Sequence, residues 1–516
     1  MSKKYFTYIT VMAGMWLFGA CSDKFLEIEP KGSYLESNYY RNQTEAFNGL
    51  VAVYDVVGWQ GGGFVTKVGA LNAAADDHYA GGGGSSDMMA LQVMSNWTLT
   101  PITGPQEELW KKGFAGVFRA NIMLTKLPGV PMEEHIKKRY EAETKFLRAF
   151  FYFDLVRLFK NIPLFTKPVT TAEMYGVVQA TPEAVYDQIE ADLKAAIAET
   201  NLPDQVPRQG EAGRVTKGAA HALLGKVYLY RQKWTDAARE LELVNGTTPG
   251  QVNAVYGYKL IPRFADLWKS DAVSKFSSES ILEVAYNSTS GGVWSAVGST
   301  EGNLLNIMTG PRGYSTLKDG APDYVSGWSF LVFTPEFYRF MHDDPRFGAT
   351  VADLDSLKRN GIARYDAGYM NTGYFLNKFA GRVSNISKGG GNLELNFPQN
   401  MYEIRLADTY LMEAEARIKA GESGGAGSRA YALLNAVRAR VGLGPLPATF
   451  DHIFNERRLE LAGEGHRWFD LVRTGRAAAA LGSRGFIAGR HDILPIPLLE
   501  MENTKLEQSK EWGGTK

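Results

Sequence analysis

The sequence has almost no cysteine: Cys21 is the only one among 516 residues. A single cysteine excludes an internal disulfide and a zinc site built from several thiolates. The role of Cys21 must therefore come from its position near the amino end of the chain.

The formal net charge at pH 7 is zero, because 56 lysine and arginine residues balance 56 aspartate and glutamate residues. Proteins that bind nucleic acid usually carry a basic excess or a basic stripe, and the sequence shows neither. We therefore set a nucleic-acid partner aside.

The signatures of several enzyme classes are missing. None of the seven histidines stands in an H-E-x-x-H arrangement, and the glycine runs lack the Gly-Lys-Ser/Thr of a phosphate loop. Residues 421–425 (GESGG) fit G-x-S-x-G, but they follow a predicted helix, whereas a nucleophile elbow needs a strand. A glycoside hydrolase needs two carboxylates across one cleft, which the adjacent pairs Asp76/Asp77 and Asp343/Asp344 do not form by themselves. We expect no catalytic residues, no cofactor and no metal.

The amino end has the layout of a secretory signal. Lys3 and Lys4 precede an uncharged apolar run over residues 5–20, which is shorter than the roughly 20 apolar residues of a comfortable membrane span. Small residues then lead directly into Cys21, as in a bacterial lipoprotein, with Phe18 where such signals usually have leucine. We expect a signal peptide over residues 1–20, a lipid on Cys21, and a polar tether over residues 21–40. An uncleaved anchor and ordinary secretion are the alternatives.

Apolar residues recur at helical spacing in two blocks, residues 41–244 and residues 401–516. Thr181 and Pro182 have the N-cap and first-turn chemistry of a helix start. Gly225, Tyr228 and Trp234 follow the spacing of a tetratricopeptide helix pair, in which a small residue lets two helices approach closely. The aromatic segment over residues 146–159 is predicted to be core, with Arg148 and Arg157 paired to buried acceptors.

Two irregular segments interrupt the helical blocks. Residues 58–105 contain two glycine runs, prolines and scattered aromatics, and are predicted to form a long, structured surface excursion. Residues 245–400 are rich in glycine, serine, asparagine and aromatics, with short strands expected over 280–286 and 374–379. Loops on a rigid repeat frame commonly carry binding, so we expect the ligand site in these segments.

Several stretches of the sequence resemble one family, the SusD-like (RagB/SusD) nutrient-binding lipoproteins of the outer membrane, and they occur in the family's order along nearly the whole mature chain. They are the signal with Cys21 followed by SDKFLEIEP, AETKFLRAFFYFDLVRLFKNIPL (142–164), GRVTKGAAHALLGKVYLYRQKWTDAA (213–238), RLADTYLMEAEAR (405–417), NAVRARVGL (435–443), IFNERRLELAGEGHRWFDLVRTG (453–475) and ILPIPLLEMENTKLEQ (493–508).

The resemblance implies a mainly α fold, with a tetratricopeptide-type frame of about four helix pairs and a loop-rich second region that carries the ligand site. It also implies a lipid-anchored protein that faces the cell exterior. Such a protein captures oligosaccharide or polysaccharide, in some members peptide, for a SusC-like TonB-dependent outer-membrane barrel.

The candidate ligand residues come from the two irregular segments, from which SusD-like proteins build their sites. Flat aromatic faces suit the C–H surfaces of sugars, and polar side chains fix their hydroxyl groups. The alternative role of each aromatic is to pack the loops onto the frame, and Asp76 or Asp77 could instead cap a helix or turn. The candidates are Asp76, Asp77, His78, Tyr79, Trp97, Trp294, Tyr314, Tyr324 and Trp328.

Glycan capture is the function that these residues favour. Peptide capture for the same kind of transporter predicts a site of polar groups with its aromatics packed away. A surface glycoside hydrolase predicts turnover, and a helical-repeat adaptor predicts another surface protein as partner. The cluster of charges in 455–471 (NERRLELAGEGHRWFDL) looks catalytic, but ion pairs that join helix ends explain it better.

Overall fold

The structure is a computed structural model that describes residues 39–59, 64–295, 300–386 and 389–514. The predicted signal peptide, the predicted lipidation at Cys21 and most of the predicted tether lie outside the described residues. Helices dominate the fold, and the strands of the described residues pair as three two-stranded antiparallel sheets, so the predicted mainly α class is confirmed. No helix in these ranges is both long and apolar enough to cross a membrane.

The frame is built from long helices at the positions that the apolar spacing predicts. They are α2 (Gln43–Gly58), α5 (Gln106–Lys126), α6 (Glu134–Phe159), α8 (Pro182–Ala198), α10 (Lys217–Tyr230), α11 (Trp234–Asn245), α16 (Leu406–Lys419), α17 (Arg429–Arg440) and α18 (Phe450–Glu460). Shorter helices accompany them: η4 (Leu127–Gly129), α7 (Thr171–Met174), α9 (Arg208–Glu211), α19 (Arg467–Arg473), α20 (Ala477–Leu481), η9 (Gly482–Arg484), α21 (Leu498–Met501) and η10 (Lys510–Trp512).

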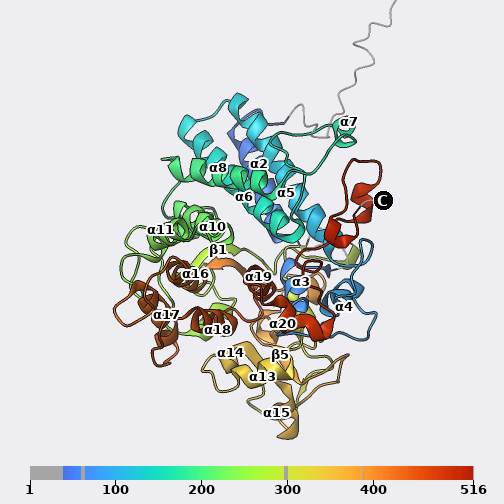
Figure 1. Ribbon diagram of the computed structural model, residues 1–516. Helices are drawn as coiled ribbons and strands as arrows, with labels where there is room; N and C mark the ends of the chain where they lie inside the picture. Colours follow the sequence, from blue (N-terminus) through green and yellow to red (C-terminus); the bar gives the residue numbers. More distant parts are fainter. Residues whose placement is uncertain (1–38, 60–63, 296–299, 387–388, 515–516) are drawn as a thin grey trace, which may run out of the picture.

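The long helices stack in chain order. α2 packs on α5, α5 on α6, α6 on α8, α8 on α10, α10 on α11, α11 on α16, and α16 on α17 and α18 (Figure 1). Successive antiparallel neighbours of this kind form the curved frame of a helical-repeat protein. The four pairs α2/α5, α6/α8, α10/α11 and α16/α17 correspond to the expected repeats.

Local sequence explains how these helices start and approach one another. The Thr181 hydroxyl accepts a hydrogen bond from the Ala184 amide, and Pro182 occupies the first turn, as predicted. A Cβ atom at Gly225 would lie 2.6 Å from Leu241 Cγ, so only glycine lets α10 and α11 pack this closely. The residues 421–425 lie in the turn between α16 and α17, which confirms that their G-x-S-x-G pattern belongs to an inter-helix loop.

The first irregular segment differs from the prediction, because part of it lies in the interior. It contains α3 (Lys67–Ala73) and α4 (Met89–Ser95), and Val68 through Ala73 in α3 are buried. The Asn72 side chain donates to Gly463 O and accepts from the Gly465 amide. The small apolar residues of α3 let it insert against α19 and the loop before it, so this segment is part of the core and not a surface excursion.

The second irregular segment contains short elements only. They are η5 (Phe264–Trp268), β1 (Ser280–Val284), α12 (Leu305–Thr309), β2 (Ser315–Thr316), α13 (Pro335–Met341), α14 (Phe347–Thr350), β3 (Val351–Asp353), α15 (Leu354–Arg359), β4 (Ala363–Arg364), β5 (Tyr374–Leu376), η7 (Val383–Asn385), η8 (Leu393–Leu395) and β6 (Met401–Arg405). β1 pairs with β6, β2 with β4, and β3 with β5. The predicted strands over 280–286 and 374–379 are confirmed as β1 and β5.

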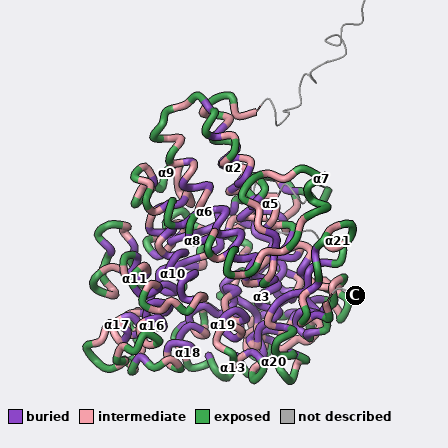
Figure 2. Tube along the Cα trace, turned by 45° about the horizontal axis from the view of Figure 1, so that its top comes forward, coloured by how far each residue is buried: buried purple, intermediate pink, exposed green. Residues whose placement is uncertain are grey.

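A buried ion-pair network joins this segment to the helical frame. β1 and β6 run antiparallel with Ser280 opposite Arg405, which brings Glu279 beside the Arg405 guanidinium. Arg405 also contacts Glu460 at 2.6 Å and Glu464 at 2.8 Å. Figure 2 shows that buried residues fill the interior of the molecule, whereas exposed residues lie mostly in its peripheral loops. The prediction that the charges of 455–471 form ion pairs between helix ends is confirmed.

The arginines predicted to pair in the core also do so. Arg148 donates to both carboxylate oxygens of Asp192, at 2.8 and 2.7 Å, and Arg157 pairs with Asp154. The aromatic rings of 146–159 are buried around them, with Phe146, Phe151 and Phe153 at most 1% exposed. These side chains stabilise the frame and are not available to a ligand.

Candidate ligand-binding site

Two of the predicted ligand residues, Trp294 and Trp328, lie together on the surface with a third aromatic, Phe64. The Phe64 ring centroid is 5.4 Å from that of Trp294 and 5.8 Å from that of Trp328, and both contacts are edge-on. The two indoles are nearly parallel, with an interplanar angle of 26° and a centroid separation of 6.0 Å. We call these three side chains the aromatic triad.

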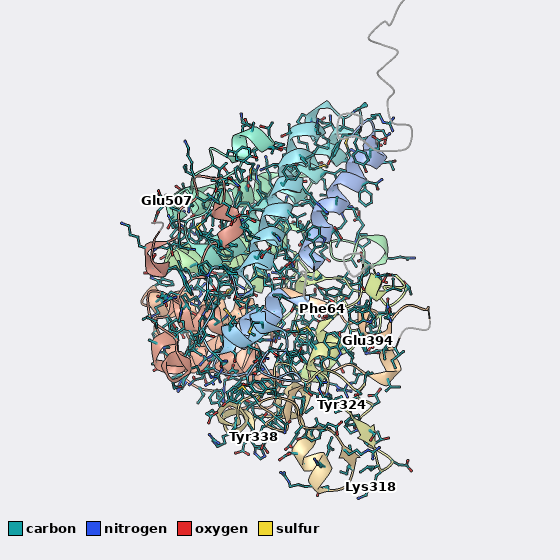
Figure 3. All side chains as sticks on the ribbon, turned by 90° about the vertical axis from the view of Figure 1, so that its right-hand side faces the viewer. Phe64, Lys318, Tyr324, Tyr338, Glu394 and Glu507 are labelled. Carbon is teal, nitrogen blue, oxygen red and sulfur yellow. The ribbon has the colours of Figure 1, made fainter. Side chains whose placement is uncertain are left out.

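The triad presents aromatic surface to solvent. Trp294 is 39% exposed, and Phe64 and Trp328 are half-buried. The 6.0 Å between the indole centroids exceeds the roughly 3.5–4.0 Å of carbon contact, so the two rings are displaced and not directly superposed. Figure 3 shows Phe64 near the lower end of α2, away from Tyr324 and Tyr338 lower in the molecule.

Two residues at the triad have backbone conformations that residues other than glycine rarely adopt. Phe64 has φ 66° and Ser329, next to Trp328, has φ 62°. Such left-handed conformations cost about 1–3 kcal/mol each for non-glycine residues and persist where the surroundings enforce them, often at binding sites. Gly327 before Trp328 has no room for a Cβ, which would lie 2.5 Å from Gly310 Cα. Trp328 is therefore held rigidly in its position.

Asparagines and a carbonyl fix the loop that carries Trp294. The Trp294 amide donates to Asn392 Oδ1 at 3.2 Å, and the Gly292 amide donates to Asn396 Oδ1 at 2.9 Å. Asn396 in turn donates to Gly292 O at 3.0 Å. These bonds hold the indole in place before a ligand arrives, which lowers the entropy cost of binding.

Polar groups lie beside Trp328. The Arg312 guanidinium donates to Trp328 O at 3.1 Å and lies 4.0 Å from the Asp87 carboxylate. Asp87 accepts from the Gly83 amide at 2.7 Å. Arg312 Nε has no hydrogen-bond acceptor in the part of the chain that the structure describes. Because Arg312 and Asp87 each remain about 40% exposed, they supply a donor and an acceptor at the edge of the triad.

The structure places Asp76 and Asp77 elsewhere, in ion pairs with the carboxyl-terminal helices. Asp76 accepts two hydrogen bonds from Arg467, at 2.8 and 2.9 Å, and Asp77 pairs with Arg458 at 2.7 Å. Asp77 is 1% exposed. Their prediction as ligand residues is corrected, because both carboxylates are used to fasten the first irregular segment to α18 and α19.

His78 and Trp97 are buried as well, so these two predictions are also corrected. His78 Nδ1 lies 2.9 Å from Leu331 O, and its ring stacks on Phe333 with centroids 4.3 Å apart. Trp97 is 4% exposed and packs against aromatic rings of the carboxyl-terminal region. Its neighbours are Trp468, Phe486 and His491.

The three predicted tyrosines belong to a second packed cluster. Tyr314 and Tyr324 are 8% and 6% exposed, and their hydroxyls donate to Pro322 O and Asn377 Oδ1. Tyr79 is half-buried against the same cluster, with the Arg484 guanidinium 4.7 Å from its ring centroid. Because Tyr314 and Tyr324 are buried, their prediction as ligand residues is corrected to a packing role, whereas the prediction for the half-buried Tyr79 stays a prediction.

The sequence reasoning missed Phe64, Asp87 and Arg312. A signal for Phe64 was present, because it follows Gly61–Gly63 directly, as Trp294 follows Gly291, Gly292 and Val293. An aromatic within two residues of a glycine run therefore occurs in both irregular segments. No comparable local pattern marks Asp87 or Arg312, which reach Trp328 only through the tertiary fold.

The burial of His78 predicts a pH dependence of stability. Burial lowers the pKa of His78 from 6.5 to about 3, so the folded protein keeps the ring neutral where the unfolded chain takes up a proton. This contribution is fully present above the unfolded pKa and is lost as the pH falls through 6.5 towards 3, by about 1.4 kcal/mol per pH unit.

We therefore expect the free energy of unfolding in urea to fall between pH of about 6.5 and about 5, and to fall less steeply in His78→Gln. His466 and His491, whose pKa values burial lowers to about 4, keep a residual slope in the variant. Equal slopes for the two proteins would show that His78 is not the group that titrates.

The fold and site together define a class: a helical-repeat protein whose inserted loops carry a rigid, partly exposed aromatic surface. The family model described as the SusD family matches residues 278–486. A second, SusD-like model, described as starch-binding and associating with the outer membrane, matches residues 33–229.

The chain belongs to the SusD family. It is similar over 91% of its length to a solved laminarin-binding SusD-like protein, with 52% identity, 99% of that chain covered and a TM-score of 0.87. A surface glycan-binding protein A from Bacteroides thetaiotaomicron, solved in complex with laminarihexaose, is 27% identical over 90% of this chain and 98% of its own, with a TM-score of 0.78. A SusD-like protein from Formosa agariphila is 24% identical over 97% of both chains.

Proposed function

We propose that the protein captures glycan by stacking sugar rings on the aromatic triad. The observation that carries this proposal is the rigid, partly exposed surface of Phe64, Trp294 and Trp328. Pyranose rings have apolar C–H faces that stack on aromatic rings, and hydroxyl groups that need polar partners. Arg312 and Asp87 supply a donor and an acceptor at the edge of the same surface.

The ligand class that we propose is a β-1,3-linked glucan of the laminarin type. The similarity to a laminarin-binding protein, at 52% identity over 91% of this chain, supports it. The relative solved with laminarihexaose supports the same class. The exposure of Trp294 favours glycan over peptide, since peptide capture predicted that the aromatics would be packed away.

The further steps of the proposal concern where the protein acts. We propose that a lipid on Cys21 anchors it to the outer membrane, facing the cell exterior, and that it passes glycan to a SusC-like TonB-dependent barrel without cleaving it. The matching family description, starch-binding and associating with the outer membrane, supports this location. The sequence of the amino end supports the anchor.

The experiment is affinity electrophoresis of the protein without residues 1–21 through native gels that contain laminarin, starch or mannan. We expect laminarin to retard the protein most, and the polymer recovered afterwards to keep its length. Retardation by starch or mannan but not laminarin would contradict the ligand class. No retardation by any polymer would contradict glycan capture, and a shortened polymer would contradict the non-catalytic role.

A further inference from the structure

A cleft of about 700 Å³ lies between α2, α5 and β1, on the frame beside the triad. Beside apolar and basic side chains, its lining contains aromatic rings, carboxylates and hydroxyls from Tyr54, Asp55, Trp59, Tyr286, Thr300 and Glu301. Ligand sites for small polar molecules have such volumes and linings. The three side chains of the triad do not line this cleft, so its polar and aromatic lining needs a separate explanation.

A contact between two described residues places the cleft close to the triad. Trp59, the C-cap residue of α2, lines the cleft. Thr300, in the lining, packs on Gly292 near Trp294, where a Cβ atom would lie 2.4 Å from its hydroxyl oxygen. A glycan chain that extends from Trp294 past Gly292 therefore reaches Thr300 in the lining of the cleft.

The cleft is rigid on the side of α2. The Tyr286 hydroxyl donates to Gly58 O at 3.1 Å, and Lys112 donates to Val57 O at 2.8 Å and Trp59 O at 2.9 Å. The Trp59 indole donates to Asp55 at 2.9 Å, and the Arg119 guanidinium covers its ring at 4.8 Å. Trp59 is thus fixed in one orientation and remains half-buried.

The charges of the lining point to a neutral ligand. Asp55 pairs with Arg119 at 2.7 Å, and Arg214 pairs with Glu143. The Lys112 ammonium donates its hydrogen bonds to backbone carbonyls. Among the described residues, no hydrogen bond or ion pair is made by the carboxylate of Glu301. Burial, and then the charge of Asp55, raise the pKa of that carboxyl. Because the neighbouring charges are paired within the protein, the Glu301 carboxylate can accept hydrogen bonds from the hydroxyl groups of a ligand.

We propose that this cleft is a second saccharide subsite, which binds the continuation of a glycan chain that rests on the triad. The inference builds on the proposed glycan capture. Glu301 accepts hydrogen bonds from sugar hydroxyls, and the half-buried Trp59 indole borders the sugar ring. The protein therefore binds a longer stretch of polysaccharide than the triad alone covers, and its affinity is higher for long chains than for short ones.

The test compares the affinity of a β-1,3-linked trisaccharide with that of laminarin, by isothermal titration calorimetry. In Glu301→Gln, which keeps the side-chain shape, we expect affinity for laminarin to fall about tenfold, as for the loss of one charge-assisted hydrogen bond. We expect the affinity for the trisaccharide to stay at the wild-type value, and Trp59→Ala to show the same pattern. Glu336→Gln, which changes another exposed carboxylate, on α13, is the control and should bind both as wild type does.

The outcomes separate the two proposals. If the wild-type protein binds laminarin and loses it in the triad variants, but Glu301→Gln and Trp59→Ala bind laminarin as wild type does, the second subsite is wrong and glycan capture stands. If both variants weaken the trisaccharide equally, the cleft is part of the triad site and not a separate subsite. If wild type binds no glycan, both proposals fail.

Discussion

Trp328→Ala is expected to weaken the capture of laminarin strongly. The indole contacts both Trp294 and Phe64, so its removal deletes one sugar platform and part of the support of the other two rings. Loss of about 100 Å² of apolar contact with the sugar costs ~2.5 kcal/mol at roughly 25 cal/mol/Å². That is a decrease in affinity of about 60-fold before any loss of order in Trp294 and Phe64. Calorimetric titration with laminarin measures it.

Tyr175→Ala is the matched control for this prediction. Tyr175 is 58% exposed, more than Trp294, and it lies outside the triad and the cleft. It should bind laminarin with the wild-type affinity if the triad is the site. If Trp328→Ala binds within about twofold of wild type, or if Tyr175→Ala weakens binding equally, the triad is not the platform.

Arg405→Met is expected to destabilise the protein by about 3–5 kcal/mol, because it leaves buried carboxylates without their partner. Arg405 is 1% exposed and makes ion pairs with Glu279, Glu460 and Glu464. Burial would raise the pKa of Glu460, but the guanidinium groups of Arg440, Arg405 and Arg346 hold it well below its usual range. Loss of one of these cations destabilises the charged form of the Glu460 carboxylate. Urea unfolding followed by circular dichroism measures the change in free energy.

The exposed pair of Arg359 and Asp355, at 3.2 Å, provides the comparison. Arg359→Met should cost less than about 1 kcal/mol, because solvent screens exposed ion pairs. Similar costs for Arg405→Met and Arg359→Met would mean that the buried network does not hold β1, β6 and α18 together.

The helical frame could be predicted from the sequence because its information is local. The spacing of apolar residues located the long helices, and Thr181 with Pro182 marked the start of α8. The core role of residues 146–159 followed from their density of aromatics. The interior position of α3 did not follow, because a short run of small apolar residues does not indicate which distant surface will cover it.

The candidate site could be predicted only in part, because burial of polar residues depends on distant partners. Asp77 can be buried because it pairs with Arg458, which lies 381 residues further along the chain. Trp294 was favoured by its position after two glycines, and it lies in the triad. Trp97 and Trp328 were equally plausible from sequence alone, but one packs on Trp468 and the other lies at the surface.

A crystal structure with a β-1,3-linked hexasaccharide tests the central claim most directly. We predict continuous density for sugar rings stacked on Trp294 and Trp328, with hydroxyl groups within hydrogen-bond distance of Arg312 and Asp87. Density for the hexasaccharide at another surface, with the aromatic triad free of sugar at saturating ligand, would contradict the account.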